Sequence, residues 1–366
     1  MRPVLILGGY GNFGKRIARA LNGDGIAVII AGRNGEKAVE LVASLNSPNA
    51  SSAVFDVHRA LDQQLKVMKP GVVINTCGPF QSSDYKVAQT CIENGVHYID
   101  LADGRDFVPG ITALDGAATA AGVSVISGAS TVPGLSSAVL EKFAPEFSRI
   151  DEMRYGISPG QKAERGLATT QGILGYVGKA FEPFASGQKR VFGWQDIYRQ
   201  SYPELGKRWM ANCDIPDLGL FPDRYGIRSI RFSAGLELGV LHLGLWGLSW
   251  LVRLGLPLGL ERLAVAMLKI SNAFNRFGSA DGGMHIVLSG LDHDGQPHSR
   301  SWFIVARSGD GPHIPTVPAV ILAKDLVRGE PVPKGAHPCV GLVSLDRYWA
   351  ELGGFDMSQY IDGVAV

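Results

Sequence analysis

The sequence has few of the features that mark disulfide-bonded, metal-dependent or nucleic-acid-binding proteins. Its 366 residues include four cysteines, which lie far apart and form no CxxC pair. A reduced, cytoplasmic setting without structural zinc is therefore expected, and no metal site is predicted. The net charge is only +1 and no basic block occurs, so nucleic-acid binding has no electrostatic support. Neither HExxH nor Tyr-x-x-x-Lys occurs, which leaves zinc-peptidase and short-chain dehydrogenase chemistry without a motif.

What the sequence does contain is a glycine-rich turn in residues 3–14, PVLILGGYGNFG. The apolar run before the turn predicts a buried strand rather than a signal peptide, and an apolar stripe over 15–21 predicts a helix after it. Between a strand and a helix, a GxGxxG spacing predicts dinucleotide binding. The first glycine permits the turn, the second lets a pyrophosphate approach, and the third lets the helix pack closely. The residues expected to hold the cofactor here are Gly9, Gly11, Asn12, Phe13 and Gly14.

The end of the second predicted strand, 26–31, indicates which dinucleotide is bound. NAD-selective sites usually carry an acidic residue there for the ribose 2′-hydroxyl. This chain has Gly32-Arg33-Asn34 instead, and a cation at Arg33 suits the 2′-phosphate of NADP(H). Lys37 is expected to assist, and Asn34 to line the site. The alternative interpretation of Arg33 is a solvated surface arginine.

Six predicted strands alternate with helices, which predicts a doubly wound Rossmann domain in an α/β protein. The strands expected after the first two are 52–57, 71–75, 97–101 and 123–127. Asp56 has two interpretations, either contact with the adenine side of the cofactor or a helix N-cap. Ligands of such sheets lie beyond the carboxyl ends of the strands, so the turn after 71–75 should line the cofactor cleft. That turn contains Cys77, Gly78, Pro79 and Phe80.

Four segments together resemble the saccharopine dehydrogenase-like superfamily. They are GGYGNFG with AGRN after the second strand, NTCGPF, CIENGVHYIDLADG and SGASTVPGLSSAVLE, and the tail SWFIVARSGDGPHIPTVPAVILAKDLVRG matches more weakly. The superfamily includes saccharopine reductases and trans-acting enoyl reductases of lipid assembly. The resemblance therefore implies NADP(H)-dependent oxidoreductase chemistry.

By matched position, the resemblance places the turn at 77–80 and the pair Ala102 and Asp103 around the cofactor. It places the loop 130–135 near the nicotinamide, and its residues expected to bind substrate are Ser130, Thr131, Val132 and Pro133. Many relatives have DLTGE where this chain has DLADG. The glutamate is therefore missing, which leaves any carboxylate role at this position in question.

The second half of the chain predicts an α+β domain with an antiparallel sheet. Residues 283–291 alternate in polarity and, with 300–306, predict a hairpin. We expect residues 134–314 to form a substrate and dimerisation domain, so that a homodimer is one expected assembly. Residues 1–133 with a C-terminal return over about 315–366 would form the dinucleotide-binding domain. Arg165 suits a substrate carboxylate, although a surface arginine is the simpler interpretation.

Residues 238–260 form an unusual apolar segment whose single charge is Arg253. Four interpretations stay open: buried core helices, the wall of an apolar substrate tunnel, a patch for peripheral membrane contact, and a membrane span. The charge-free part, residues 238–252, is shorter than the roughly 20 residues that a span needs. An apolar wall would suit an acyl, polyketide or terpenoid-like substrate better than an amino-acid adduct.

The leading candidates for the proton donor of such a reaction are Asp103, His285 and Cys77, with Arg105, His313 and direct protonation by water as the alternatives. The leading prediction is an NADP(H)-dependent oxidoreductase that acts on a C=C, C=O or C=N bond of an apolar small molecule. A saccharopine-type imine reductase is the alternative, and would need clustered arginines for its carboxylates. The alternative that is not an enzyme is an NADP-binding protein docked on a lipid surface. Such a protein would be cytoplasmic and associated with a membrane.

Overall fold

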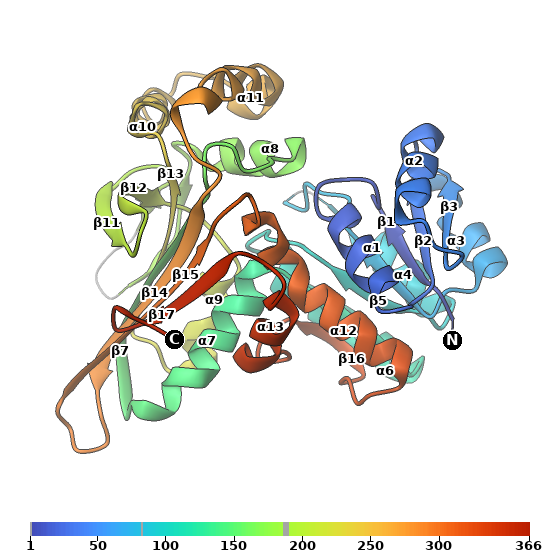
Figure 1. The fold of residues 1–366 in the computed structure, drawn as a ribbon. Helices are drawn as coiled ribbons and strands as arrows, with labels where there is room; N and C mark the ends of the chain where they lie inside the picture. The colour runs from blue at the N-terminus through green and yellow to red at the C-terminus, as the bar shows by residue number, and fades with distance from the viewer. Residues whose placement is uncertain (1, 82, 186–189) are drawn as a thin grey trace. The chain divides into compact units, whose positions relative to one another are not determined.

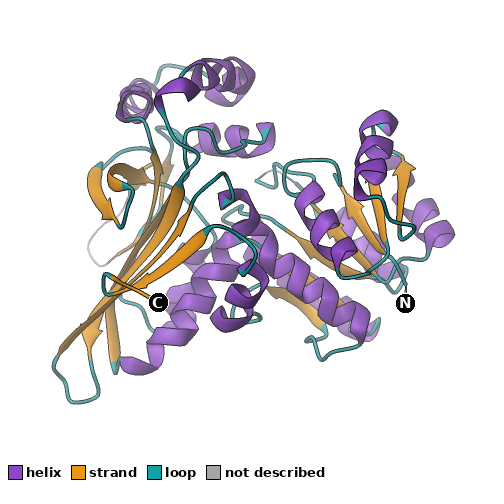
Figure 2. Ribbon diagram, viewed as in Figure 1, coloured by secondary structure: helices purple, strands orange, loops and turns teal. Residues whose placement is uncertain are grey.

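The computed structural model describes residues 2–81, 83–185 and 190–366, which divide into two compact units (Figure 1). Unit 1 comprises Met1–Ala138 and His313–Glu351, and unit 2 comprises Val139–Pro312 and Leu352–Val366. Each unit combines helices with a sheet (Figure 2). The predicted α/β fold class, with a second α+β part, is confirmed.

In the described residues, unit 1 has a seven-stranded parallel sheet in the order β16-β6-β5-β4-β1-β2-β3. The strands are β1 (Val4–Leu7), β2 (Val28–Gly32), β3 (Ala50–Val54), β4 (Val72–Asn75), β5 (His97–Asp100), β6 (Ser124–Ser127) and β16 (Gly335–Pro338). The order of the first six is that of a doubly wound dinucleotide-binding domain, as predicted. β16, which the sequence did not indicate, extends the sheet beside β6.

Helices cover both faces of this sheet because its central strands are apolar on both sides. β1 is buried along its whole length. The helices are α1 (Gly14–Gly23), α2 (Gly35–Leu45), α3 (Val57–Met68), α4 (Lys86–Glu93), α5 (Phe107–Gly110), α6 (Asp115–Ala120), α12 (Val317–Arg328) and α13 (Leu345–Leu352). One core cluster joins apolar residues of α3, α4 and α6 to the sheet. On the other face α12 contacts α1, β4 and β5.

The third strand is shorter than predicted, because Asp56 begins the next helix. The strand ends at Val54. The carboxylate of Asp56 accepts a hydrogen bond from the His58 N–H at 3.0 Å, which makes Asp56 the N-cap of α3. Of the two interpretations of Asp56, the structure therefore supports the helix cap.

In the described residues, unit 2 has a nine-stranded sheet with the order β11-β12-β13-β7-β14-β15-β17-β18 and with β9 beside β13. Its strands are β7 (Arg149–Ser158), β9 (Phe184–Ala185), β11 (Tyr198–Tyr202), β12 (Gly206–Asn212), β13 (Ser229–Leu236), β14 (Gly282–Leu291), β15 (Pro297–Ala306), β17 (Met357–Ile361) and β18 (Val364–Ala365). Among the described strands of this sheet, only the pairing of β13 with β7 is parallel. The predicted hairpin of β14 and β15 is confirmed. β8 (Ala180–Phe181) and β10 (Val191–Phe192) form a separate pair.

The end of the chain differs from the predicted C-terminal return. Residues 313–351 belong to unit 1, but residues 352–366 belong to unit 2. The reason is that β17 pairs with β15 in antiparallel register and extends the second sheet. The hydrogen bond of Trp302 Nε1 to Gln359 Oε1, at 2.8 Å, fixes this pairing further.

The apolar segment 238–260 forms α10 (Gly239–Arg253) and the loop after it, near α8 (Leu167–Tyr176) and α11 (Ala264–Ala273). These three helices share one core cluster, which includes Leu174, Leu248 and Ala264. α7 (Ser136–Phe143) and α9 (Asp217–Tyr225) complete the α-helices of the described residues. No described helix combines the length and the hydropathy needed to cross a membrane, which argues against the span interpretation.

Candidate cofactor site

The glycine turn between β1 and α1 packs too closely for side chains at several of its glycines. A Cβ on Gly8 would lie 2.7 Å from Thr76 Oγ1, and one on Gly14 would lie 2.4 Å from the Gly8 carbonyl oxygen. Gly9 is also confined, since its Cβ would lie 2.9 Å from the Ile6 carbonyl oxygen. The left-handed residue of the turn is Gly8, with φ of +71°, rather than Gly9 as the motif suggested. The sequence analysis passed over Gly8 because it lies just before the GxGxxG spacing.

Gly11 borders open space on the side away from the turn. An added Cβ there would meet one protein atom within 4 Å, the Gly8 carbonyl oxygen at 3.0 Å. Phe13 follows as the first flanking residue of α1, and no described side chain caps this helix start. The Asn12 side chain is held by the guanidinium of Arg16. An open approach to an uncapped helix N-terminus is the arrangement that a pyrophosphate needs.

Tyr10 links the glycine turn to the loop after β2. Its hydroxyl accepts a hydrogen bond from the Asn34 N–H at 2.9 Å. Its ring covers Gly32, where an added Cβ would lie 2.4 Å from a ring carbon. Tyr10 therefore sets the position of the Gly32-Arg33-Asn34 loop. Its only signal in the sequence is its place inside the glycine motif.

The loop after β2 and the first turn of α2 present two exposed cations, Arg33 and Lys37. In the described part of the chain neither of them forms a salt bridge, and the loop has no carboxylate of its own before Glu36. Asn34 caps α2, because its Oδ1 accepts a hydrogen bond from the Lys37 N–H at 3.0 Å. Its side-chain oxygen is thus used within the loop, and the two cations are the groups available to a phosphate.

A buried carboxylate ties together the carboxyl ends of β5 and β6. Oδ1 of Asp100 accepts hydrogen bonds from Ala102 N–H at 3.0 Å, Ser127 Oγ at 2.9 Å and Gly128 N–H at 2.8 Å. Asp100 is fully buried, and burial raises the pKa of its carboxyl to about 6. Asn75 plays a similar part for β4, accepting from Cys77 N–H at 3.0 Å. These residues hold the loops around the site, and the sequence analysis did not single them out.

Of the turn after β4, Cys77 and Pro79 are exposed and Gly78 is half-buried. The surrounding protein nevertheless raises the pKa of the Cys77 thiol to about 11, so the thiol is neutral at pH 7. Phe80 is buried, with its ring 5.5 Å from that of Phe107, and supports the turn from within. The buried side chain of Phe80 is therefore not placed to make the predicted contact with the cofactor.

The loop after β5 contains the predicted pair Ala102 and Asp103. Ala102 is fully buried, so only its backbone can line a site. Asp103 is half-buried, and its Oδ1 accepts a hydrogen bond from Gln81 Nε2 at 2.9 Å. Burial raises the pKa of Asp103, which favours the protonated carboxyl more than in an exposed aspartate.

The loop after β6 contains the four residues predicted to bind substrate. Thr131, Val132 and Pro133 are buried, and Ser130 is half-buried. All four follow the carboxyl end of β6, the same edge of the sheet as Cys77 and Asp103. Ser130 is the one of the four that is not buried.

His285, the predicted proton donor in unit 2, lies in the interior of that unit. It is fully buried on β14, and its Nδ1 pairs with the Tyr202 hydroxyl at 2.7 Å. Burial lowers the pKa of His285 to about 3. A neutral imidazole enclosed by Tyr202 and Phe303 is explained by packing, so a role of His285 as proton donor has no support from its surroundings.

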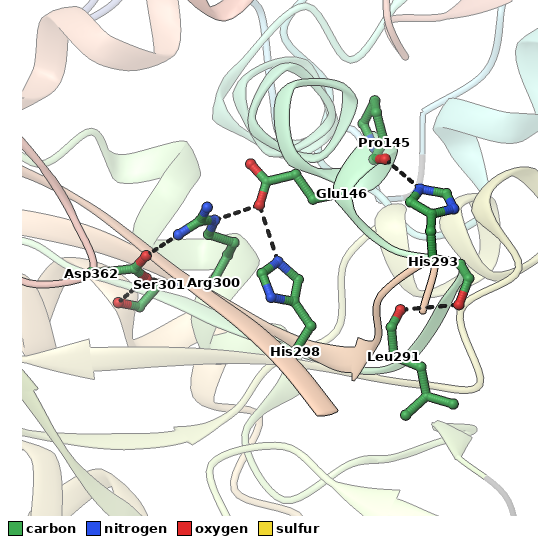
Figure 3. Close-up of polar contacts among 9 residues, drawn as sticks. Pro145, Glu146, Leu291, His293, His298, Arg300, Ser301 and Asp362 are labelled. Atoms are coloured by element: carbon green, nitrogen blue, oxygen red, sulfur yellow. Dashed lines mark hydrogen bonds and ion pairs between the residues drawn. The ribbon is translucent and has the colours of Figure 1, made fainter. Parts of the chain in front are cut away.

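Arg165, predicted to bind a substrate carboxylate, is instead held inside unit 2. Its guanidinium donates hydrogen bonds to the Ser271 hydroxyl and to the Gln161 carbonyl oxygen. Arg300 is held in the same way between the carboxylates of Glu146 and Asp362 (Figure 3). Both arginines have protein partners, so the expectation that Arg165 meets a substrate carboxylate is not supported. In the described residues there is also no group of His, Cys, Asp and Glu side chains fit to hold a metal ion.

Comparison with known proteins agrees with this geometry. Residues 4–126 match the family described as the saccharopine dehydrogenase NADP binding domain. No curated protein matches the chain. The fold of the apo saccharopine dehydrogenase (L-Glu forming) from Saccharomyces cerevisiae is similar, with 15% identity, a TM-score of 0.69 and coverage of 99% of this chain and 100% of that one.

A second structure, an amine dehydrogenase from Mycobacterium smegmatis, has 12% identity, a TM-score of 0.49 and coverage of 93% of this chain and 95% of that one. The family match covers the strands β1 to β6 that carry the glycine turn, Arg33 and Asp100. The predicted cofactor, NADP(H), agrees with the description of that family. Residues 4–126 therefore match the saccharopine dehydrogenase NADP-binding domain, and the chain as a whole is similar in fold to a saccharopine dehydrogenase.

Proposed function

We propose that the protein is an NADPH-dependent reductase of a C=C, C=O or C=N bond in an apolar small molecule. The nicotinamide supplies the hydride, so the protein has to bind the cofactor, orient it and provide a proton. The groups for these tasks lie at one edge of the parallel sheet of unit 1, at the carboxyl ends of β1, β2, β4, β5 and β6.

In this proposal Gly11 and the start of α1 hold the pyrophosphate, while Arg33 and Lys37 hold the 2′-phosphate. The fit is supported by the open side of Gly11 and by the exposure of both cations without a salt bridge in the described residues. An acidic residue at the end of β2 would repel the 2′-phosphate, and none stands there. Tyr10 positions the loop that carries Arg33.

The apolar substrate is proposed from the arginines of unit 2, and this is the observation that carries it. A substrate with several carboxylates would need arginines free to pair with them. Arg228 instead faces Asp151 at 3.3 Å, and Arg231 donates to the Asp196 carbonyl oxygen and lies 4.9 Å over the Tyr198 ring. Arg165 and Arg300 also have protein partners, so all four of these arginines, the set from which we would draw the carboxylate-binding cluster of an imine reductase, are engaged within unit 2.

We place the proton donor among Asp103 and Cys77. Both lie in loops at the carboxyl edge of the sheet, and both are biased toward their protonated forms, since their pKa values are raised. Ser130 is proposed to contact the substrate, because it is the one predicted residue of its loop that is not buried. Replacement of Asp103 by Asn, and separately of Cys77 by Ser, would show which group supplies the proton.

The test is NADPH consumption by the purified protein with apolar enoyl, keto and imine compounds, and with a dicarboxylic amino-acid adduct. We expect turnover of at least one apolar compound and none of the adduct. Arg165→Ala should leave KM for that compound unchanged. Turnover of the adduct alone would favour the imine-reductase alternative, and NADPH binding without turnover of any compound would contradict a reductase.

A further inference from the structure

The helix α10 has two apolar faces, of which unit 2 covers only one. On the covered side Leu245, Leu248 and Val252 join the core cluster shared with α8 and α11. On the opposite side the exposed residues are Val240, Leu243, Trp250, Leu251 and Leu254, and the positions between them include two glycines. A surface helix normally carries polar residues on its outer face. On α10, by contrast, the five exposed residues of the outer face are all apolar.

The exposed apolar surface continues beyond α10. Leu256, Leu263, Val265, Ile270 and Phe277 are also exposed, in the following loop, in α11 and just after it. Ten of the sixteen large apolar side chains exposed in the described residues thus come from residues 240–277. Figure 1 draws α10 and α11 at the same end of unit 2. We call these ten side chains the apolar surface, and a concentration of this kind marks an interaction site.

Cations accompany the apolar surface, and anions are almost absent from it. Between residues 238 and 280 the sequence has four cations, Arg253, Arg262, Lys269 and Arg276, and one acidic residue, Glu261. All four cations are exposed, while Glu261 faces Lys179 at 3.5 Å. Arg253 lies 4.9 Å over the Trp250 ring and Arg276 lies 4.5 Å over the Phe277 ring. The positive charge is therefore beside the exposed aromatic rings.

We infer that the apolar surface docks the protein on the face of an anionic phospholipid bilayer. Helices with apolar side chains, interfacial tryptophan and flanking cations lie in the headgroup region, where the cations pair with lipid phosphates. α10 has 15 residues, about 22 Å of helix at 1.5 Å per residue, so it lies along the bilayer rather than across it.

The charge distribution favours lipid over a second copy of this chain. In a two-fold contact the same patch meets itself. Such a contact through the apolar surface would bring four cations of one copy toward four of the other, with only Glu261 to offset them. A bilayer rich in anionic lipid supplies the opposite charge instead. This inference concerns where the protein binds, and it does not depend on the reaction proposed above.

Vesicle flotation of the full chain tests the inference, with phosphatidylcholine vesicles compared with vesicles that also contain phosphatidylglycerol. We expect at least about tenfold stronger binding to the anionic vesicles, weakened by salt. Trp250→Asp with Leu254→Asp should reduce binding at least about tenfold. Arg262→Glu with Lys269→Glu should remove the preference for anionic lipid.

The matched control is Val39→Asp with Val67→Asp, two exposed valines of unit 1, which should bind vesicles as the parent protein does. Circular dichroism and thermal melting show that each variant is folded. Absence of flotation with both vesicle types would overturn the inference, as would equal loss in the control. A third result would also overturn it: the parent protein binds no vesicles but sediments as a dimer, and the double variant Trp250→Asp with Leu254→Asp sediments as a monomer. NADPH titration of the same samples reports separately on the proposed function.

Discussion

Replacement of Arg33 by Ala should weaken the binding of NADPH and leave that of NADH almost unchanged. The residue is exposed at the end of β2 and has no salt-bridge partner among the described residues, so its removal breaks no ion pair there. A hydrogen bond to a charged group contributes about 1.5–3 kcal/mol. Exposure to solvent places Arg33 at the lower end of this range. Since 1.4 kcal/mol is a tenfold change, the Kd of NADPH should rise about tenfold.

The assay is titration of the protein with NADPH and with NADH, followed by the fluorescence of the reduced nicotinamide. Arg33→Asp should have a larger effect than Arg33→Ala, because a carboxylate repels the 2′-phosphate, and the effect should shrink with added salt. Arg19→Asp changes the charge of an exposed arginine of α1 in the same way and serves as control. Equal loss of affinity for NADPH and NADH, or no loss for either, would refute the assignment of Arg33 to the 2′-phosphate.

Two further predictions concern the scaffold of the site, and a third concerns Arg165 of unit 2. Gly8→Ala should lower Tm and abolish NADPH binding, because φ of Gly8 is +71° and the new Cβ would lie 2.7 Å from Thr76 Oγ1. Gly23→Ala is the control and should do neither, since a Cβ at Gly23 would have no atom within 4 Å. Burial raises the pKa of Asp100 to about 6. Between about pH 4 and pH 6 the Asp100 carboxyl is therefore protonated in the folded state and ionised in the unfolded state. The free energy of unfolding should fall by roughly 3 kcal/mol as the pH rises through this range. Chemical denaturation of Asp100→Asn across this pH range should lack that decline, and an unchanged slope would contradict it. Arg165→Ala should lower Tm without affecting NADPH affinity, since its partners Ser271 and Gln161 belong to unit 2.

The parts of the site that follow one another along the chain were predictable. The glycine turn, the cation at position 33 and the six parallel strands each depend on a local pattern of residue types. The packing at Gly14 agrees with its predicted role, because its Cβ would lie 2.4 Å from the Gly8 carbonyl oxygen. The cap formed by Asp56 was one of two interpretations, since a carboxylate at a strand end fits either.

The errors of the sequence analysis concern residues whose environment is set by distant parts of the chain. His285 has the alternation of a half-exposed strand, yet Phe303 of the adjacent strand β15 and Tyr202 of the more distant strand β11 enclose it. Arg165 looks free in the sequence, but its partner Ser271 is more than a hundred residues away. Asp100 was not singled out, because its three donors come from two separate segments, the loop after β5 and the end of β6 with the residue that follows it.

The sequence by itself determined the dinucleotide-binding domain and the chemistry offered at the end of β2, because hydrophobic periodicity, glycine spacing and the identity of one cation are local properties. Only the tertiary structure decided which polar side chains are available to ligands and which are used up within the protein. It also showed that α10 covers the core with one face and leaves the other open. A helix that is apolar all round has the same sequence pattern in both cases, since burial depends on which neighbours the fold brings to it.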